Sequence, residues 1–260
     1  MATRISIFAC VIILIIPCIG ETKVDDDLAV YLPFDSGTGK VAKDVAEHGN
    51  DGQFMGTVKW GAIEFDGGIE LDGGSYVDIP WSDSIDVGEE SFSTEIWFKY
   101  SEEVSHGSLI WAYKVGGGKP QFWIRTEPKD NRIRGLIHDG VSPIIVVTKE
   151  PHNDGNWHHL AFVRDKKQDT LTIYIDGVVE DSQNGKKQGS PTKRQEFGIH
   201  LGQRVDGQNK FKGFLDEYRL WTRALSKAEI KAIMTQGKDQ ILAVHPTGRL
   251  TTTWGRIKNR

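Results

Sequence analysis

The sequence predicts an all-β fold in which two antiparallel sheets pack face to face as a sandwich. Short runs of alternating apolar and polar residues recur about every 8–15 residues, and turn signals rather than helices separate them. Glycine supplies 29 of the 260 residues and aromatic residues 10% of the chain. Many turns joining aromatic-rich strands would produce both excesses, and the length suffices for one large β domain.

The predicted strands follow one another along most of the chain. The first is an apolar run that ends at the glycine-rich turn 35–39. Asp176 and Gly177 are typical of the two-residue turn of a hairpin. Strands are expected at 28–34, 62–65, 69–71, 76–79, 91–100, 108–113, 121–125, 132–138, 144–148, 157–164, 171–175, 178–179, 197–201 and 214–221, with a long polar loop over 180–196.

One helix is predicted after the last of these strands. Ser226 is a good N-cap, and Glu229 three residues later completes a capping box. Ile230 and Ile233 have helical spacing, and Gly237 is a natural end. The domain is therefore expected to cover residues 21–237. Residues 238–260 would form a C-terminal extension, with short strands at 241–244 and 250–254 packed on the domain or on a partner.

The first twenty residues indicate a secretory signal peptide, 1–20. A short basic segment around Arg4 precedes an apolar run over 7–16, and Cys18 and Gly20 stand at the −3 and −1 positions of a cut after residue 20. The run is short for a membrane-spanning helix, which needs about 17–25 residues. An uncleaved signal anchor and a lipid-modified Cys18 are the alternatives. Both cysteines, Cys10 and Cys18, lie in this segment, so a secreted mature chain would have no disulfide.

The charge balance argues against nucleic acid as a partner. The formal net charge is −4, from 32 basic and 36 acidic residues, whereas a general nucleic-acid binder carries a basic excess. No further apolar run of membrane length follows the signal, so no membrane span is expected after signal removal. The expected location is secreted or extracytoplasmic, with the cell surface as an option.

Several short motifs follow one another in a characteristic order from about residue 28 to residue 234. They are AVYLPFD (29–35), GNDG (49–52), FDGG (65–68), SYVDIP (75–80), FSTEIWFK (92–99), WHHLA (157–161), LTIYIDG (171–177), GFLDEYRL (213–220) and RALSKAEI (223–230). Their order resembles that of the LamG-like jelly rolls of the concanavalin A-like lectin/glucanase superfamily. This resemblance implies a concanavalin A-like jelly-roll sandwich, and it leaves the function open among lectins, glycosidases, adhesion modules and structural modules.

The resemblance also suggests a structural calcium ion. Alternation places Phe214, Asp216, Tyr218 and Leu220 on one face of their strand, so Asp216 is a carboxylate in an apolar setting that needs a partner. In relatives the loop after the first strand meets this strand, and a calcium ion is often held nearby. The oxygen-rich loop supplies the hard donors that calcium prefers, and the expected ligands are Asp35, Asp44, Asn50 and Asp216. The alternative is that Asp216 pairs with an arginine or caps backbone N–H groups.

Catalytic motifs are not evident in the sequence. Adjacent residues of a strand face opposite ways, so His158 and His159 are not expected to share a metal. Glu95 lies in a central strand analogous to that of the glucanase branch, but no second acid follows it in the glucanase pattern. The chain is therefore not expected to be an enzyme, and a glycoside hydrolase is kept as the second alternative.

The function that the sequence favours is a secreted, noncatalytic binding module for carbohydrate or another extracellular ligand, including a cell-surface protein. Trp81 follows a proline in a polar loop and is the predicted ligand-contacting aromatic residue. Trp111, Tyr113, Phe122 and Trp123 lie on strands, where some must pack in the core. The first alternative is a structural or cell-surface assembly module without a small ligand.

Overall fold

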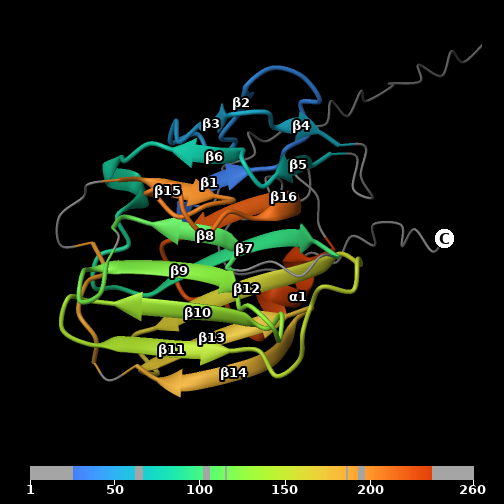
Figure 1. The fold of residues 1–260 in the computed structure, drawn as a ribbon. Helices are drawn as coiled ribbons and strands as arrows, with labels where there is room; N and C mark the ends of the chain where they lie inside the picture. The colour runs from blue at the N-terminus through green and yellow to red at the C-terminus, as the bar shows by residue number, and fades with distance from the viewer. Residues whose placement is uncertain are drawn as a thin grey trace, which may run out of the picture.

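The computed structural model describes residues 26–61, 67–101, 106–114, 116–185, 187–192 and 197–235. The predicted signal peptide, the predicted strand at 62–65 and the predicted C-terminal extension lie outside these residues. In the described part, two eight-stranded antiparallel sheets pack against each other and one helix follows them, which confirms the predicted jelly-roll sandwich (Figure 1).

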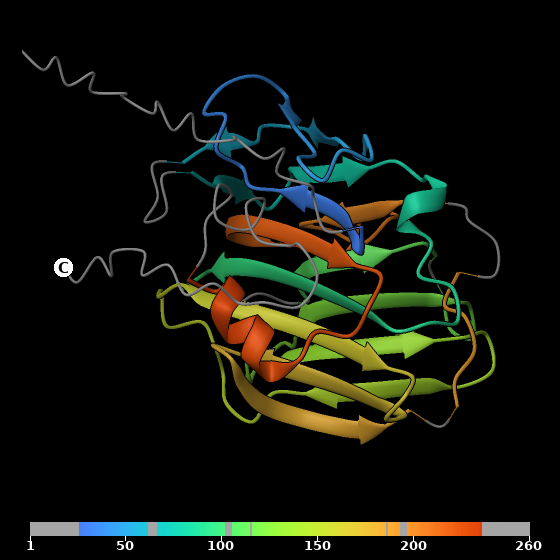
Figure 2. The same ribbon diagram turned by 180° about the vertical axis from the view of Figure 1, so that it is seen from behind.

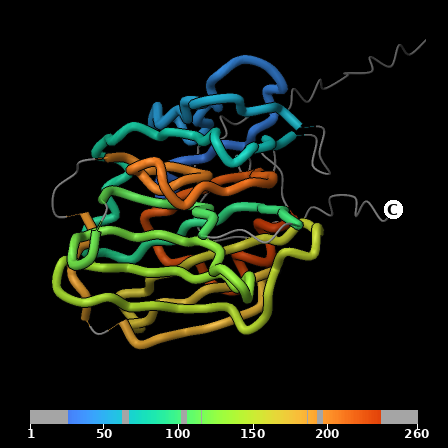
Figure 3. Tube along the Cα trace, in the orientation of Figure 1, coloured from blue at the N-terminus to red at the C-terminus, as the bar shows by residue number. Residues whose placement is uncertain are grey.

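The first sheet, sheet A, has the strand order β14-β13-β12-β7-β16-β5-β4, and β1 also pairs with β16. Its β1 and β16 come from the two ends of the described chain and lie side by side, as the trace in Figure 3 shows. Its strands are β1 (Leu28–Leu32), β4 (Lys59–Trp60), β5 (Ile69–Asp72), β7 (Phe92–Lys99), β12 (His158–Asp165), β13 (Thr170–Ile175), β14 (Val178–Asn184) and β16 (Lys212–Trp221).

The second sheet, sheet B, has the order β11-β10-β9-β8-β15-β6-β3-β2. Its middle strands lie in front in Figure 1, with sheet A behind them. Its strands are β2 (Val41–Ala42), β3 (Gly52–Met55), β6 (Tyr76–Ile79), β8 (Ser108–Ala112), β9 (Gln121–Thr126), β10 (Ile133–His138), β11 (Pro143–Val147) and β15 (Ile199–Leu201). A 3-10 helix, η1 (Asp83–Ile85), follows β6.

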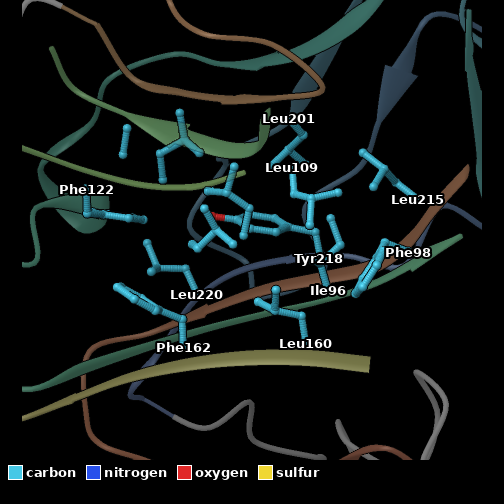
Figure 4. Packing of buried hydrophobic residues seen from close by; sticks show 14 of the residues in the cluster. Ile96, Phe98, Leu109, Phe122, Leu160, Phe162, Leu201, Leu215, Tyr218 and Leu220 are labelled. Atoms are coloured by element: carbon cyan, nitrogen blue, oxygen red, sulfur yellow. The ribbon is translucent and has the colours of Figure 1, made fainter. Parts of the chain in front are cut away.

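The main core fills the space between the two sheets. Figure 4 shows Phe98, Phe162 and Tyr218 from sheet A meeting Leu109 and Phe122 from sheet B, and all five are buried. Alternation supplies this layer, because every second residue of a strand points to the same face. The short strands β2, β3 and β4 were not predicted from the sequence. β2 and β4 have only two residues each, and β3 (GQFM) lacks the apolar–polar alternation that indicated β5 and β6.

The helix α1 (Lys227–Ile233) covers part of the outer face of sheet A (Figure 2). Its predicted capping box is confirmed: Glu229 N–H donates to the Ser226 side chain, and Ser226 N–H donates to the Glu229 carboxylate. Ile230 and Ile233 pack into a second apolar cluster with Trp221 of β16. The helix thus buries an outer surface of the sandwich next to the last strand.

The polar stretch after the Asp176-Gly177 turn is not all loop. The expected loop over 180–196 is wrong in its first part, because β14 continues to Asn184 and pairs with β13. Its polar side chains cap the neighbouring sheet: Val147 N–H of β11 donates to Asp181 (3.0 Å), and Lys149 N–H donates to Glu180 (2.9 Å). β11 is an edge strand of sheet B, so its outer N–H groups have no neighbouring strand to bond to. The acids of β14 accept these hydrogen bonds, which explains why β14 is polar.

A bulge in β16 changes which of its residues face the core. The register against β7 shifts between Asp216 and Arg219, and Glu217 has a positive φ of 53°. Leu215 and Tyr218 therefore both point into the core, three positions apart. The predicted common face for Phe214, Asp216, Tyr218 and Leu220 is wrong because the extra residue of a bulge breaks the two-residue period. Phe214 is half-buried and lies against Trp157 instead.

Candidate functional site

Two stacked tryptophans lie on the outer face of sheet B. Trp111 of β8 and Trp123 of β9 are direct cross-strand partners. Their ring centroids are 5.3 Å apart and their planes differ by 14°. The alternate residues Phe122 and Ile124 point into the core, so the strand pleat itself sends the tryptophans outward. Only 3% of Trp111 and 6% of Trp123 is exposed, because neighbouring side chains cover them.

Arginines cover the free sides of this stacked pair. The guanidinium carbon of Arg125 lies 4.4 Å from the centre of the Trp123 ring, and that of Arg204 lies 5.5 Å from the Trp111 ring. Arg125 is two residues from Trp123 on the same strand, and Arg204 comes from the loop between β15 and β16. Cation–π contacts hold each guanidinium in one place. Two arginines are thereby fixed on a rigid aromatic support.

Acidic side chains lie beside both arginines. Arg125 Nε donates to Glu127 (2.9 Å), and Glu127 also lies 3.6 Å from Arg134 and 3.8 Å from His106. Arg204 forms two hydrogen bonds of 2.7 Å with Asp206. Burial, followed by the charge of Arg125, lowers the pKa of His106 from its ordinary value, and Arg134 and Arg204 add to this while Glu127 opposes it.

The aromatic surface continues across β15 to β6. His200 is the cross-strand partner of Trp111, and its ring lies 4.7 Å from that of Tyr76. His200 Nε2 lies 3.3 Å from Asp78, and Tyr76 is half-buried. We call the surface formed by Tyr76, His200, Trp111, Trp123, Arg125 and Arg204 the aromatic–arginine face. It lies across β6, β15, β8 and β9 of sheet B, the sheet whose middle strands lie in front in Figure 1.

The sequence prediction singled out Trp81 instead. Trp81 is half-buried, packs against the main core and meets the Tyr113 ring edge-on, with centroids 5.6 Å apart. Its role as a ligand-contacting residue stays a prediction. The alternation of Gln121, Trp123 and Arg125 is visible in the sequence and could have indicated an aromatic and basic outer face. Arg204 could not be placed, because its loop comes from a distant part of the chain.

Two of the four predicted calcium ligands lie near each other. Asp216 is fully buried, and its Oδ2 has no hydrogen-bond partner among the described residues. Burial first, and then the negative charges of Glu217 and Asp35, raise the pKa of Asp216 to about 8. Asp35 is exposed and contributes to this repulsion, so it lies within electrostatic reach. A buried carboxylate oxygen next to a second acid fits a divalent cation, which would neutralise both charges.

The other two predicted ligands serve a separate network. Asp44 accepts backbone hydrogen bonds from Tyr31 (2.9 Å), Ala46 (3.0 Å) and Asn50 (3.0 Å). The Asn50 side chain donates to the Ala29 carbonyl (2.7 Å) and accepts from Ser82 (2.5 Å). These bonds tie β1 to the following loop. Within the described ranges, no group of three or more His, Cys, Asp or Glu side chains is arranged to hold a metal ion.

A buried ionic network lies on the outer side of sheet A. Arg219 lies 3.2 Å from Glu95, contacts Glu217 and donates to the Tyr31 hydroxyl (2.9 Å), which donates to Glu217 (2.6 Å). His159 lies 3.3 Å from Glu95. Burial opposes ionisation of Glu95, but His159 and Arg219 together lower its pKa; burial raises the pKa of Glu217. The contacts of Glu95 and Glu217 thus link β1, β7, β12 and β16.

His158 makes different contacts from His159, as the alternation predicted. Its Nδ1 lies 2.8 Å from Asp176 and its Nε2 lies 3.1 Å from Asp154. The hydrogen bond to Asp176 is the main cause that raises the pKa of His158 above its ordinary value of 6.5, while burial opposes it. The neighbouring His152 ring, 5.1 Å away, has a lowered pKa, chiefly through burial. His158 and His159 therefore face separate carboxylates, Asp176 and Glu95.

Stability is expected to depend on pH through His158. Its folded pKa lies above its unfolded pKa, so the proton stabilises the folded chain below about pH 6.5 and this contribution is lost as pH rises through the folded value. The difference in unfolding free energy between the wild type and His158→Gln should shrink from pH 6 to pH 8. Urea denaturation at several pH values measures it, and a difference that stays constant would contradict the assignment.

The comparisons with known proteins agree with this architecture. The family model described as the concanavalin A-like lectin/glucanases superfamily matches residues 71–231, more than half of the chain. The chain belongs to this superfamily. Among curated proteins it is 27% identical over 153 residues to the sushi, von Willebrand factor type A, EGF and pentraxin domain-containing protein 1 of Rattus norvegicus, covering 56% of the chain and 4% of that protein. The chain therefore corresponds to a small part of this relative.

The solved structures that match the fold of this chain include binding domains. Domain 4 of the arabinanase AbnA from Geobacillus stearothermophilus, solved with arabinotriose, matches with a TM-score of 0.62, 20% identity, 80% of this chain and 98% of that chain. The binding domain of botulinum neurotoxin DC, solved with rat synaptotagmin II, matches with a TM-score of 0.62, 16% identity, 80% of this chain and 51% of that chain. At these identities the likeness shows the fold. Of the helices described, none has the length and apolar character to span a membrane.

Proposed function

We propose that this superfamily member is a secreted, noncatalytic binding module that binds carbohydrate on the aromatic–arginine face. The observation that carries the proposal is the pair of arginines fixed on the stacked Trp111 and Trp123 rings. Because the tryptophans are nearly covered, a ligand would meet the edges of the guanidinium groups and the half-buried Tyr76 ring. Guanidinium groups that the tryptophan rings already hold in place can bind hydroxyl and acidic groups with little loss of side-chain entropy.

A structural calcium ion is part of this proposal. It would be held by Asp216 and Asp35, and its chemical contribution would be to neutralise their charges and join β16 to the chain after β1. It would take no part in contacts with a ligand on the other sheet. The signal-like first twenty residues support export.

The competing function is a structural or cell-surface assembly module. The match to a toxin domain solved with synaptotagmin shows that the fold occurs in a protein solved with a protein partner, while the match solved with arabinotriose favours carbohydrate. The chain's own polar and aromatic face agrees better with a glycan, since a large protein interface is expected to have an apolar centre. A hydrolase would have to release product from a polysaccharide.

Glycan-array binding, measured with and without Ca²⁺, tests the proposal. The wild type should bind a defined set of glycans, and Arg125→Gln should lose those signals while keeping its melting temperature. Arg132→Gln is the matched control, because Arg132 lies on the connection that follows β9, the strand of Arg125, and pairs with Asp130 at the surface. An empty array together with a stable protein partner in a pull-down would overturn the proposal and favour the assembly module. Product release from polysaccharides would favour a glycosidase.

A further inference from the structure

We propose that the ligand of the aromatic–arginine face is an anionic glycan, and that Glu127 occupies the place of its acidic group in the free protein. This inference rests on the proposed function and specifies its ligand class. The acidic group would be a sulfate or a carboxylate, both of which match the planar donors of a guanidinium.

Glu127 is shared by two arginines, whose combined charge exceeds what one carboxylate can neutralise. Its Oε1 accepts from Arg125 Nε at 2.9 Å, and its Oε2 lies 3.6 Å from Arg134 and 3.8 Å from His106. The last two distances exceed an ordinary hydrogen bond. Arg134 Nε is buried and has no hydrogen-bond partner within the described residues. Arg125 and Arg134 therefore keep N–H donors for a second acidic group, or for an acidic group that displaces Glu127.

The arginines are held in place before any ligand arrives. Arg125 lies over Trp123, and Arg204 lies over Trp111 while Asp206 and Gln208 bind its guanidinium. The side chains of Arg125 and Arg204 are 16% and 21% exposed, so both keep a surface toward solvent. Fixed guanidinium groups lose less entropy on binding than free lysines or arginines would. Arg125 lies over Trp123 of β9 and Arg204 over Trp111 of β8, so a ligand that contacts both guanidinium groups must extend across the two strands.

Positive charge is in excess only around Glu127. This carboxylate faces two guanidinium groups, Arg125 and Arg134, whereas Arg204 is paired with Asp206. The net charge of −4 of the chain should weaken non-specific adsorption of polyanions, while this local excess attracts one acidic group. Neutral glycans would gain nothing from it.

Calorimetry with four glycans of matched length tests the inference. The probes are a heparin-derived hexasaccharide, its desulfated counterpart and a neutral hexasaccharide, and a galacturonate oligomer tests carboxylate alone. The sulfated or the carboxylated probe should bind at least tenfold more tightly than the neutral one, and affinity should fall as salt rises. Arg125→Gln and Arg204→Gln should each weaken binding about tenfold or more, the loss expected for one charge-assisted hydrogen bond.

Glu127→Gln gives the sharpest test, because it should strengthen binding. Removing the internal competitor is expected to raise affinity for the acidic probe about two- to fivefold. Asp130→Asn, which removes an acid from the same connection outside the cluster, is the control and should change affinity less. Glu127→Gln leaves the backbone hydrogen bonds of residue 127 to Arg132 and Asn131 in place. Melting temperatures check that both variants fold.

The outcomes separate the two proposals. Equal binding of neutral and acidic glycans would overturn the anionic ligand and leave glycan binding in place. No gain in Glu127→Gln would overturn the role of Glu127 as the internal competitor. No binding to any glycan would overturn both. Binding to vesicles of phosphatidylserine in phosphatidylcholine but to no glycan would also overturn both, because it would assign the arginines to a lipid headgroup.

Discussion

Replacing Arg219 with methionine is expected to lower the free energy of unfolding by about 3–5 kcal/mol. Arg219 is 1% exposed and is the cation that joins Glu95, Glu217 and the Tyr31 hydroxyl. Methionine fills much of the same space but carries no charge, so Glu95 and Glu217 lose their shared cation. Their charges cannot then reach water without opening the contacts among β1, β7 and β16. Urea denaturation of the wild type and the variant at pH 7 measures the loss.

Arg223→Met is the matched control. Arg223 also bridges two acids, Asp27 at 3.5 Å and Glu229 at 2.8 Å, but its side chain is 25% exposed. Water can replace the lost charge there, so the expected loss is about 1 kcal/mol or less. A triple variant that combines Arg219→Met with Glu95→Gln and Glu217→Gln should recover part of the loss. If Arg219→Met were no more harmful than Arg223→Met, the network would contribute little to stability.

The fold could be predicted from the sequence because its signals are local and repeated. Each long strand carries its own alternation, and Ser226 and Glu229 stand at the spacing of a capping box that forms as expected. The local signals fail where the chain departs from a regular period. The bulge at Glu217 adds a residue to β16, and β14 owes its polar composition to the acids that cap β11. Neither feature has a pattern that can be recognised within one short segment.

The candidate site was largely hidden for a different reason. Alternation along β9 predicts that Trp123 and Arg125 share a face, but it does not say that Trp111 and His200 lie beside them. β8 and β15 are neighbours although some 90 residues separate them. Arg204 reaches Trp111 from the loop after β15. A site assembled by such distant pairings requires the sheet order, which hydrophobic periodicity does not specify.

Removing calcium is expected to lower the melting temperature, and adding it back should restore it. Asp216 has a buried oxygen without a hydrogen-bond partner among the described residues, and the charge of Asp35 acts on it. A ligand that binds only the folded state stabilises it by about 2.7 kcal/mol at a hundredfold excess over its dissociation constant. For a domain of this size each kcal/mol corresponds to about 2–4 °C, so the shift should be about 5–10 °C. Differential scanning calorimetry in chelator and in millimolar Ca²⁺ measures it.

Three aspartate-to-asparagine variants assign the ligands. Asp216→Asn should abolish most of the calcium-dependent shift, because it removes the buried charge that the ion would neutralise. Asp83→Asn, at an exposed position, should leave the shift unchanged. Asp44→Asn is the informative third variant, since Asp44 accepts three backbone hydrogen bonds. If that is its role, the variant should melt lower by the same amount with and without calcium, whereas a lost shift would make Asp44 a ligand. A wild type that melts identically in chelator and in Ca²⁺ would rule out the ion. Burial and the charges of Glu217 and Asp35 would then keep Asp216 protonated, with its Oδ1 accepting from the Glu217 N–H (2.9 Å).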